Sequence, residues 1–471
     1  MNKITLKLFN TLTKEKETVY PQNNKVILLY TCGPTVYNYS HIGNLRTFVF
    51  EDIMRRAIEY FGFQVEHVMN ITDIDDKTIR GAIANNVDIK TFVEPYSKAF
   101  FEDVESLHLL KAHHYPKATD FIEKMIDMIK GLLEKGYAYV AKDKSIYFHI
   151  NKFSSYGKLS HLDLHSLKKG ASGIAQDEYD KEHASDFVLW KSYDASRDGE
   201  VFWESPFGKG RPGWHIECSA MAISLLGKTI DIHAGGIDNI FPHHENEIAQ
   251  SECFTGQTFV RLWVHSEHLL VDNKKMSKSL GNIYTLKDLL KKGYSPMEVR
   301  YILMQAHYRT PLNFTFKELD AVRSSLQRIK DFIYRLENLG DKNTLYPIEK
   351  LLEESHYKFK QSLADDLNIS SSLAVLFDLI REINILCDRK ELGKKEGEKI
   401  LGLLRDFNRV FAFFPLDRKE EIPKEIEELA KQREEARKSK NFSLADHLRD
   451  ALEQKGYVVE DSPIGYQIKK V

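Results

Sequence analysis

Metal-binding side chains crowd into residues 211–250, and this crowding constrains the fold more than any other feature of the chain. The segment reads RPGWHIECSA MAISLLGKTI DIHAGGIDNI FPHHENEIAQ and contains one cysteine, Cys218, close to a glycine pair. Zinc accepts thiolate sulfur, imidazole nitrogen and carboxylate oxygen together, whereas magnesium and calcium prefer oxygen ligands. The sequence therefore predicts a zinc site. The other candidate ligands in the segment are His215, His233, His243, His244, Glu245 and Glu247.

The end of this segment has helical spacing. Pro242 suits the first turn of a helix, because proline has no N–H to lose and its φ angle is already set. We therefore expect HHENEIAQ to be helical, with His243 and Glu247 one turn apart on one face. Since His244 is also within reach of Glu247, spacing alone leaves both histidines open as ligands.

A second thiolate must come from elsewhere, and Cys32 is the best candidate. It follows the apolar run KVILLYT, which predicts a buried strand. If Cys32 and Cys218 bind one ion, the two distant parts of the chain fold against each other. The alternative is that each cysteine packs as a small apolar side chain and that the helical histidine pairs with a carboxylate.

Length and charge limit the class of protein. A chain of 471 residues is too long for one ordinary domain. Its net charge of −2 excludes a protein that coats nucleic acid with a broadly basic surface, so any contact with RNA must be local. Four scattered cysteines form no disulfide framework. Because no apolar run resembles a signal peptide or a membrane span, we expect a cytoplasmic protein without membrane contact.

The order of predicted elements indicates an α/β core. Residues 4–20 alternate as a hairpin would, and the strand KVILLYT leads through a glycine-containing loop into a helix. QVEHVMNITDIDDKTI repeats this pattern, residues 85–136 read as helical, and residues 137–200 as short strands inserted between two halves of a sheet. Long amphipathic helices follow residue 294, and VVEDSPIGYQIKKV predicts a closing hairpin. We expect a Rossmann-type parallel sheet with a connective insertion, an α-helical bundle and a small C-terminal α+β domain.

Two short motifs indicate phosphate chemistry, one at each end of the α/β part of the chain. His41 in HIGN follows the first strand and could donate to a phosphate at a helix N-terminus. Lys275 and Lys278 in KMSKS put two charges beside hydroxyl groups, which can neutralise a transferring polyphosphate. Either motif alone is typical of a solvated loop. Together they predict a nucleotide site.

These motifs resemble the two signatures of class I aminoacyl-tRNA synthetases. TCGPTVYNYSHIGN, NITDIDDK, GRPGWHIECSAM and FPHHENEIAQSE are similar to those of the cysteinyl-tRNA synthetase family in particular. The resemblance extends over essentially the whole chain, including its helical C-terminal third. It implies five parts: residues 1–120 and 206–294 as the two halves of the catalytic domain, 121–205 as the connective insertion, 295–410 as a bundle contacting tRNA, and 411–471 as an anticodon-binding domain.

The resemblance also implies roles for individual residues. It favours His243 over His244 in a site for one zinc ion per chain, and it places Asp238 at the ribose of ATP. Asn44 stands where the first signature usually has histidine; asparagine can donate a hydrogen bond but cannot become a cation. We therefore rely more on His41 as the phosphate contact. The implied zinc ligands are Cys32, Cys218, His243 and Glu247; the implied ATP contacts are His41, Asn44, Lys275, Lys278 and Asp238; and Thr72, Trp214 and His233 are expected around the cysteine substrate.

The implied reaction is ATP-dependent ligation of L-cysteine to tRNA(Cys) through a cysteinyl-adenylate, with Mg²⁺ accompanying ATP. Zinc would separate cysteine from serine by chemistry, because thiolate binds zinc far better than an alcohol does, while a pocket rejects a near-isostere weakly. Four protein ligands ordinarily close a zinc site. The substrate sulfur must then expand the shell or displace the weakest ligand, which we expect to be Glu247.

We expect a monomer that contacts tRNA through its C-terminal helices, although solvated i, i+4 ion pairs would explain the same charges. One alternative is a ligase that transfers cysteine to an amino-sugar thiol precursor, but that relative lacks a full anticodon-binding extension. Another is a non-catalytic RNA-binding paralogue, which would be expected to lose KMSKS or the zinc ligands. The basic residues of the C-terminal helices are Lys431, Arg433, Arg437, Lys438, Lys440 and Arg449.

Overall fold

A parallel sheet of four strands, in the order β10-β9-β3-β4, forms the centre of the protein. The computed structural model describes residues 4–23, 25–162, 186–341, 346–416, 423–462 and 465–470. Strands β3 and β9 are direct neighbours although they lie far apart in the sequence, which confirms that the two parts of the α/β region fold against each other. The strands are β3 (Val26–Thr31), β4 (Gln64–Met69), β9 (Ile230–Gly236) and β10 (Val260–Ser266).

Helices pack around this sheet, as the strand-loop-helix patterns predicted. The expectation of helix throughout residues 85–136 is wrong for residues 107–117. This segment runs beside β4, where the N–H groups of Met69 and Ile71 donate to the carbonyls of His114 and Pro116 at 3.0 and 2.8 Å. Proline disfavours a helix at this point, and the segment supplies hydrogen-bond partners for the backbone groups of the edge strand β4. The helices are α1 (Ile42–Tyr60), α2 (Asp76–Asn85), α3 (Ile89–Ser106), α4 (Ile122–Glu134), α7 (Trp214–Leu226) and α8 (Glu245–Thr255).

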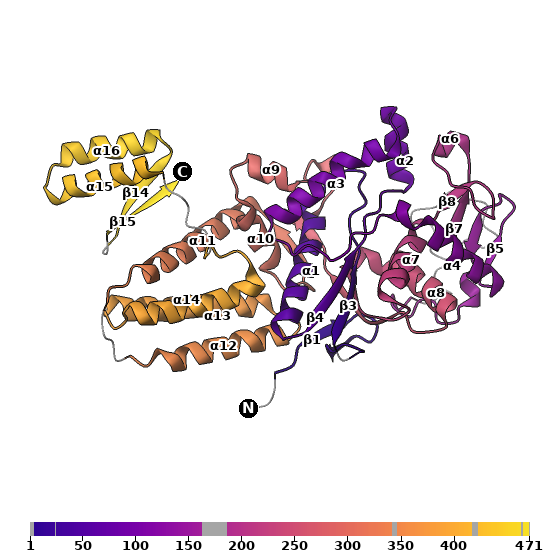
Figure 1. Ribbon diagram of the computed structural model, residues 1–471, viewed down its shortest axis with the longest axis horizontal. Coiled ribbons are helices and arrows are strands. Elements are labelled where there is room, and N and C mark those ends of the chain that lie inside the picture. The colour runs from indigo at the N-terminus through magenta and orange to yellow at the C-terminus, as the bar shows by residue number, and fades with distance from the viewer. Residues whose placement is uncertain are drawn as a thin grey trace.

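A second, antiparallel sheet lies between β4 and β9 in the sequence, in the region where a connective insertion is expected. It lies on the side of the molecule away from the long C-terminal helices (Figure 1). Residues 163–185 of the expected insertion fall outside the described residues. This region contains β5 (Ala138–Val140), β6 (Ile146–Phe148), β7 (Phe187–Ser192), α6 (Ala195–Asp198) and β8 (Gly210–Pro212), the last of which lies beyond the expected end of the insertion at residue 205.

Further short strands lie after β10 and at the two ends of the chain. The predicted N-terminal and C-terminal hairpins both form as antiparallel pairs. A three-stranded sheet, β12-β11-β13, carries the lysine-rich segment. The strands are β1 (Lys7–Asn10), β2 (Glu15–Thr18), β11 (Leu269–Val271), β12 (Lys274–Lys275), β13 (Leu312–Phe314), β14 (Tyr457–Ser462) and β15 (Gly465–Lys470).

Long amphipathic helices form the expected bundle after residue 294. Their apolar faces share one core with α1 of the α/β domain, whereas the last two helices and the C-terminal hairpin pack around a small core of their own (Figure 1). The fold-class prediction is thus confirmed. No helix in the described part of the chain has the length and apolar character that a membrane span requires. The short helix α9 (Leu286–Lys291) precedes residue 294. The helices that follow are α10 (Pro296–Met304), α11 (Phe316–Glu337), α12 (Ile348–Ala364), α13 (Ile369–Asp388), α14 (Lys394–Phe411), α15 (Lys424–Lys438) and α16 (Phe442–Gln454).

Candidate active site

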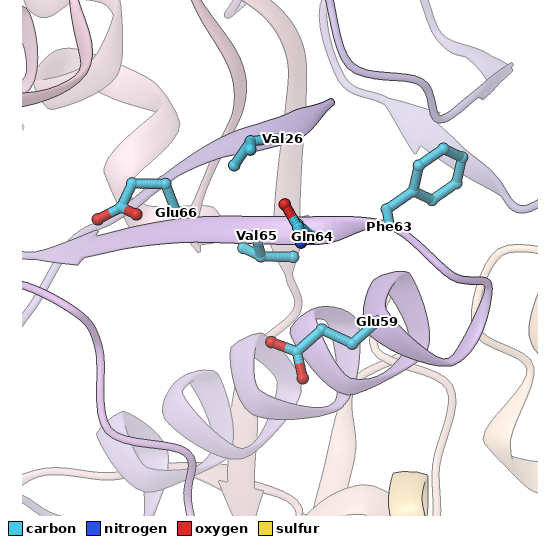
Figure 2. A pocket seen from close by; sticks show the side chains of 6 residues that line it. All are labelled: Val26, Glu59, Phe63, Gln64, Val65 and Glu66. Atoms are coloured by element: carbon cyan, nitrogen blue, oxygen red, sulfur yellow. The ribbon is translucent and has the colours of Figure 1, made fainter. Parts of the chain in front are cut away.

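The predicted site residues gather at the carboxyl ends of the parallel strands, where open α/β sheets bind their ligands. A hollow of about 380 Å³ lies instead beside the amino ends of β3 and β4 (Figure 2). Two acidic side chains line it, and both have local partners: Glu59 pairs with Arg55 at 2.9 Å and Glu66 with His114 at 3.1 Å. This hollow contains none of the predicted site residues.

Cys32 is held at the crevice by a close approach of two backbone segments. It directly follows β3, and the N–H of Gly33 donates to the Asn70 side chain at 3.0 Å. A Cβ atom on residue 33 would lie 1.7 Å from the Asn70 carbonyl oxygen. Only glycine therefore allows the Cys32 loop to pack against the end of β4.

Two helices supply the other candidate ligands. Cys218 lies in the first half of α7, and Glu247 lies near the start of α8. Phe241 has extended backbone angles (φ −134°, ψ 131°), so the helical backbone that leads into α8 begins at Pro242, as expected of a proline in a first turn. The one-turn spacing also holds, since His243 Nε2 lies 3.1 Å from Glu247 Oε1.

The ligand atoms of Cys32, Cys218, His243 and Glu247 all lie within 4.8 Å of one another. We call these four residues the metal cluster. Cys32 and Glu247 also form a second such group with His233 and His244. The metal cluster offers two thiols where the second group offers one, and soft sulfur ligands favour zinc.

Burial sets the protonation states in the metal cluster. Desolvation lowers the pKa of His243 and His244 well below the usual value, and that of His233 to about 3. It also raises the pKa of Glu247 well above its usual value. For Cys32, the hydrogen bond with Cys218 and then burial raise the thiol pKa. Neutral imidazoles are the form that binds metal, and a divalent cation would offset the buried thiolates and carboxylate.

A chain of hydrogen bonds supports the metal cluster from behind. His244 Nε2 lies 3.2 Å from Cys32 Sγ, His244 Nδ1 lies 2.8 Å from His265 Nε2, and His265 Nδ1 lies 2.7 Å from Thr11 Oγ1. On the other side, His215 Nδ1 lies 2.9 Å from His243 Nδ1. Such outer partners fix the orientation of metal-binding side chains. Sequence reasoning missed His265 and Thr11; the available signal was a histidine within the apolar strand VRLWVHS.

Of the three residues expected around the amino acid, His233 and Trp214 contact the metal cluster, and Thr72 follows the end of β4. Thr72 accepts a hydrogen bond from Asn70 Nδ2 at 3.1 Å, and His233 Nε2 lies 3.0 Å from Glu247 Oε2. The Trp214 ring stacks on His243 with 4.2 Å between ring centroids. Thr72 and His233 are buried, whereas Trp214 is exposed.

The two phosphate motifs lie side by side. A Cβ atom on Gly43 would lie 2.5 Å from Met276 Cε, and the N–H of Ile42 donates to the Tyr284 carbonyl at 2.8 Å. His41 caps α1: its Nδ1 accepts from the Asn44 N–H, while its own N–H donates to Asn44 Oδ1, both at 3.2 Å. The Asn44 side chain thus already serves the helix cap.

The remaining nucleotide candidates are placed around this contact. Lys275 is exposed on β12, and Lys278 begins a short 3-10 turn, Lys278–Leu280. Asp238 follows β9, with 81% of its side chain exposed, and its Oδ2 lies 3.3 Å from His268 Nδ1. Burial lowers the pKa of His41, so its ring is a neutral hydrogen-bonding group.

Comparisons with known proteins agree with this geometry. Residues 18–324 match the model of the class I (C) tRNA synthetase catalytic domain, residues 358–415 that of the DALR domain, and residues 419–468 that of the cysteinyl-tRNA ligase anticodon-binding domain. The cysteine–tRNA ligase of Protochlamydia amoebophila is 54% identical over 100% of this chain and 99% of that protein. The cysteine–tRNA ligase of Chlamydia muridarum is 53% identical, with coverage of 98% and 99%.

A solved structure shares the fold. The methionyl-tRNA synthetase of Mycobacterium tuberculosis in complex with methionyl-adenylate has a TM-score of 0.59 over 83% of this chain and 88% of that chain, at 12% identity. Since the sequence matches extend over almost the full length of both proteins, the chain belongs to the cysteine–tRNA ligase family of class I aminoacyl-tRNA synthetases.

Proposed function

We propose that this protein ligates L-cysteine to tRNA(Cys) in two steps, with ATP as the energy source. The observation that carries the proposal is the metal cluster, in which two thiols, an imidazole and a carboxylate from distant segments converge within 4.8 Å. Sulfur ligands at the end of a nucleotide-binding sheet are the arrangement needed to recognise an amino acid with a thiol.

Zinc fits this donor set better than an oxygen-seeking ion does. When bound, it would supply a Lewis acid that favours the thiolate of cysteine over the hydroxyl of serine. Cys32, Cys218, His243 and Glu247 would hold it, and the hydrogen bonds of His244 and His215 would orient Cys32 and His243.

The chain's own contribution to adenylate formation is positioning and charge stabilisation. The cysteine carboxylate attacks the α-phosphate of ATP, and pyrophosphate leaves. His41, Lys275 and Lys278 would contact the phosphates, with Asp238 at the ribose, and Mg²⁺ would accompany ATP. Asn44 would act mainly through the α1 cap, because its side-chain oxygen accepts from the His41 N–H.

The terminal ribose hydroxyl of tRNA then attacks the carbonyl carbon of the adenylate, and AMP leaves. The bundle over residues 295–410 and the domain over residues 411–471 would hold the tRNA, while residues 1–120 and 206–294 provide the chemistry and 121–205 the connective insertion. Local basic side chains would meet phosphates despite a net charge of −2. We further propose a monomer in the cytoplasm.

Cysteine-dependent ATP–pyrophosphate exchange, followed by tRNA(Cys) charging, tests the proposal. Exchange with L-cysteine but not with L-serine, followed by transfer to tRNA, is the expected result. Exchange without transfer to tRNA would indicate another cysteine acceptor, such as an amino-sugar thiol precursor. Absence of exchange by a zinc-loaded chain would overturn the proposed function.

A further inference from the structure

Glu217 is a buried carboxyl group to which the proposed reaction assigns no task. It lies in α7 directly before Cys218, and only 1% of its surface is exposed. Its Oε2 atom has no hydrogen-bond partner among the described residues, and no ion pair involves it there. Native proteins rarely leave a buried carboxylate oxygen unpaired, because desolvation without compensation is costly. A ligand that brings the missing charge would explain its presence.

The carboxyl group is anchored to the residues that follow β4. The side chain of Thr72 hydrogen-bonds to Glu217. The backbone N–H of Thr72 donates to the Pro34 carbonyl at 3.1 Å, which ties this position to the loop that carries Cys32. Glu217 therefore lies where the end of β4, the Cys32 loop and α7 meet, and the next residue in α7 is Cys218 of the metal cluster.

Two other carboxylates lie near Glu217, and both already have local partners. Asp73 accepts from the N–H and hydroxyl of Thr119 at 3.0 and 2.6 Å. Asp75 caps α2 by accepting from the N–H groups of residues 77 and 78, both at 2.8 Å. Within the described part of the chain, Glu217 is thus the member of this acidic group with an oxygen left for a ligand.

We propose that Glu217 binds the α-ammonium group of the cysteine substrate. The inference rests on the proposed function, since a thiol held at the metal cluster leaves the ammonium only two carbon atoms away from the sulfur. A buried carboxylate and an ammonium form a strong, charge-assisted hydrogen bond. The metal cluster would then recognise the thiol while Glu217 recognises the amino acid, so that a thiol without an ammonium group binds poorly.

Thiols that differ in their charged groups test whether the ammonium group is recognised separately from the thiol. The zinc-loaded, full-length protein is titrated calorimetrically with L-cysteine, with 3-mercaptopropionate, which lacks the ammonium, and with cysteamine, which lacks the carboxylate. We expect 3-mercaptopropionate to bind roughly 10- to 100-fold more weakly than L-cysteine, as the loss of a charged hydrogen bond predicts. Cysteamine should bind better than 3-mercaptopropionate. Equal binding of L-cysteine and 3-mercaptopropionate would overturn the inference without any variant.

The variant Glu217→Gln tests whether Glu217 is responsible for the preference for L-cysteine over 3-mercaptopropionate. It should weaken L-cysteine binding by the same factor, leave 3-mercaptopropionate binding unchanged and retain zinc. Asp73→Asn is the matched control and should keep the full preference for L-cysteine. If Glu217→Gln weakens both thiols equally, its role is structural and the inference is wrong. Should no thiol bind the zinc-loaded protein at all, the proposed function itself fails, which is a different outcome.

Discussion

The metal cluster and the phosphate motifs differ in how their side chains are held. Cys218, His243 and Glu247 are buried, and His243 and Glu247 each contact a further histidine, so packing sets their positions before any ligand arrives. Lys275 and Asp238 are exposed. Buried groups with fixed partners are pre-organised, whereas exposed lysines act as point charges on flexible stems.

This difference indicates that the metal cluster controls recognition of the amino acid and that the phosphate motifs control the rate of phosphate transfer. Recognition of the amino acid needs a rigid arrangement, because sulfur and oxygen must be separated by chemistry at one point. Stabilisation of transferring phosphates needs positive charge nearby, and an exposed side chain such as that of Lys275 can supply it once ATP is bound. Changes in the metal cluster should therefore alter metal content and substrate choice, whereas changes in the phosphate motifs should alter rate and leave the fold intact.

Cys218→Ser should produce the largest effect. We expect zinc affinity to fall by more than about 100-fold, since loss of an outer partner alone costs about 10- to 100-fold. Cysteine binding should fall with it, while ATP binding stays near normal. Metal analysis after dialysis against a chelator measures the first effect. Cys253→Ser is the control, because Cys253 is equally a buried thiol but lies outside the metal cluster. Unchanged zinc content in Cys218→Ser would contradict the site.

Lys278→Ala should slow ATP–pyrophosphate exchange by roughly 100-fold, as removal of one charge-stabilising donor does. Zinc content and thermal unfolding should stay unchanged, because the effect is confined to the transition state. Lys274→Ala is the control from the neighbouring strand β12, where Lys274 is exposed. Normal exchange kinetics in Lys278→Ala would show that Lys278 does not stabilise the transferring phosphates. A loss of zinc in this variant would show that the metal cluster and the phosphate motifs are not independent.

His265→Phe probes the support behind the metal cluster. It removes the partner of His244 at 2.8 Å, and the freed ring of His244 should then hold Cys32 less firmly. We expect zinc to leave about 10-fold faster in the presence of a chelator, at the lower end of outer-partner effects. His268→Phe is the control, since His268 contacts Asp238 instead. If zinc leaves both variants at the same rate, the series of hydrogen bonds that links Thr11, His265, His244 and Cys32 does not influence metal binding.

The sequence predicted the parts of the structure that local pattern determines. Strand β3, the hairpins, the insertion and the bundle follow from apolar spacing and turn residues, and the His243–Glu247 pair follows from helical spacing. Residues 107–117 were misread because their course is decided by pairing with β4, a contact with a distant segment. Local propensity carries no information about such a partner.

The site was predictable to the same degree. Ligand-rich motifs and the family resemblance named residues that the structure does bring together, but roles that depend on neighbours were hidden. Asn44 read as a phosphate contact, whereas its side chain also completes the α1 cap. His265 and Glu217 carried no motif of their own, and only their position behind or beside the metal cluster reveals them.

Lys440→Ala should give the smallest effect, on tRNA alone. Several basic side chains of the C-terminal helices are unsuited to phosphate contact: Arg433 is buried, and Arg449 pairs with Asp446 at 3.3 Å. Lys440 is exposed at the turn between α15 and α16. If it meets a phosphate, its loss should lower the salt slope of tRNA binding by about one, while cysteine binding stays insensitive to salt. Filter binding over a range of salt concentrations measures the slope, with Arg449→Ala as the paired-residue control. If Arg449→Ala lowers the salt slope more than Lys440→Ala does, ion pairing within the helix does not predict which side chains contact RNA.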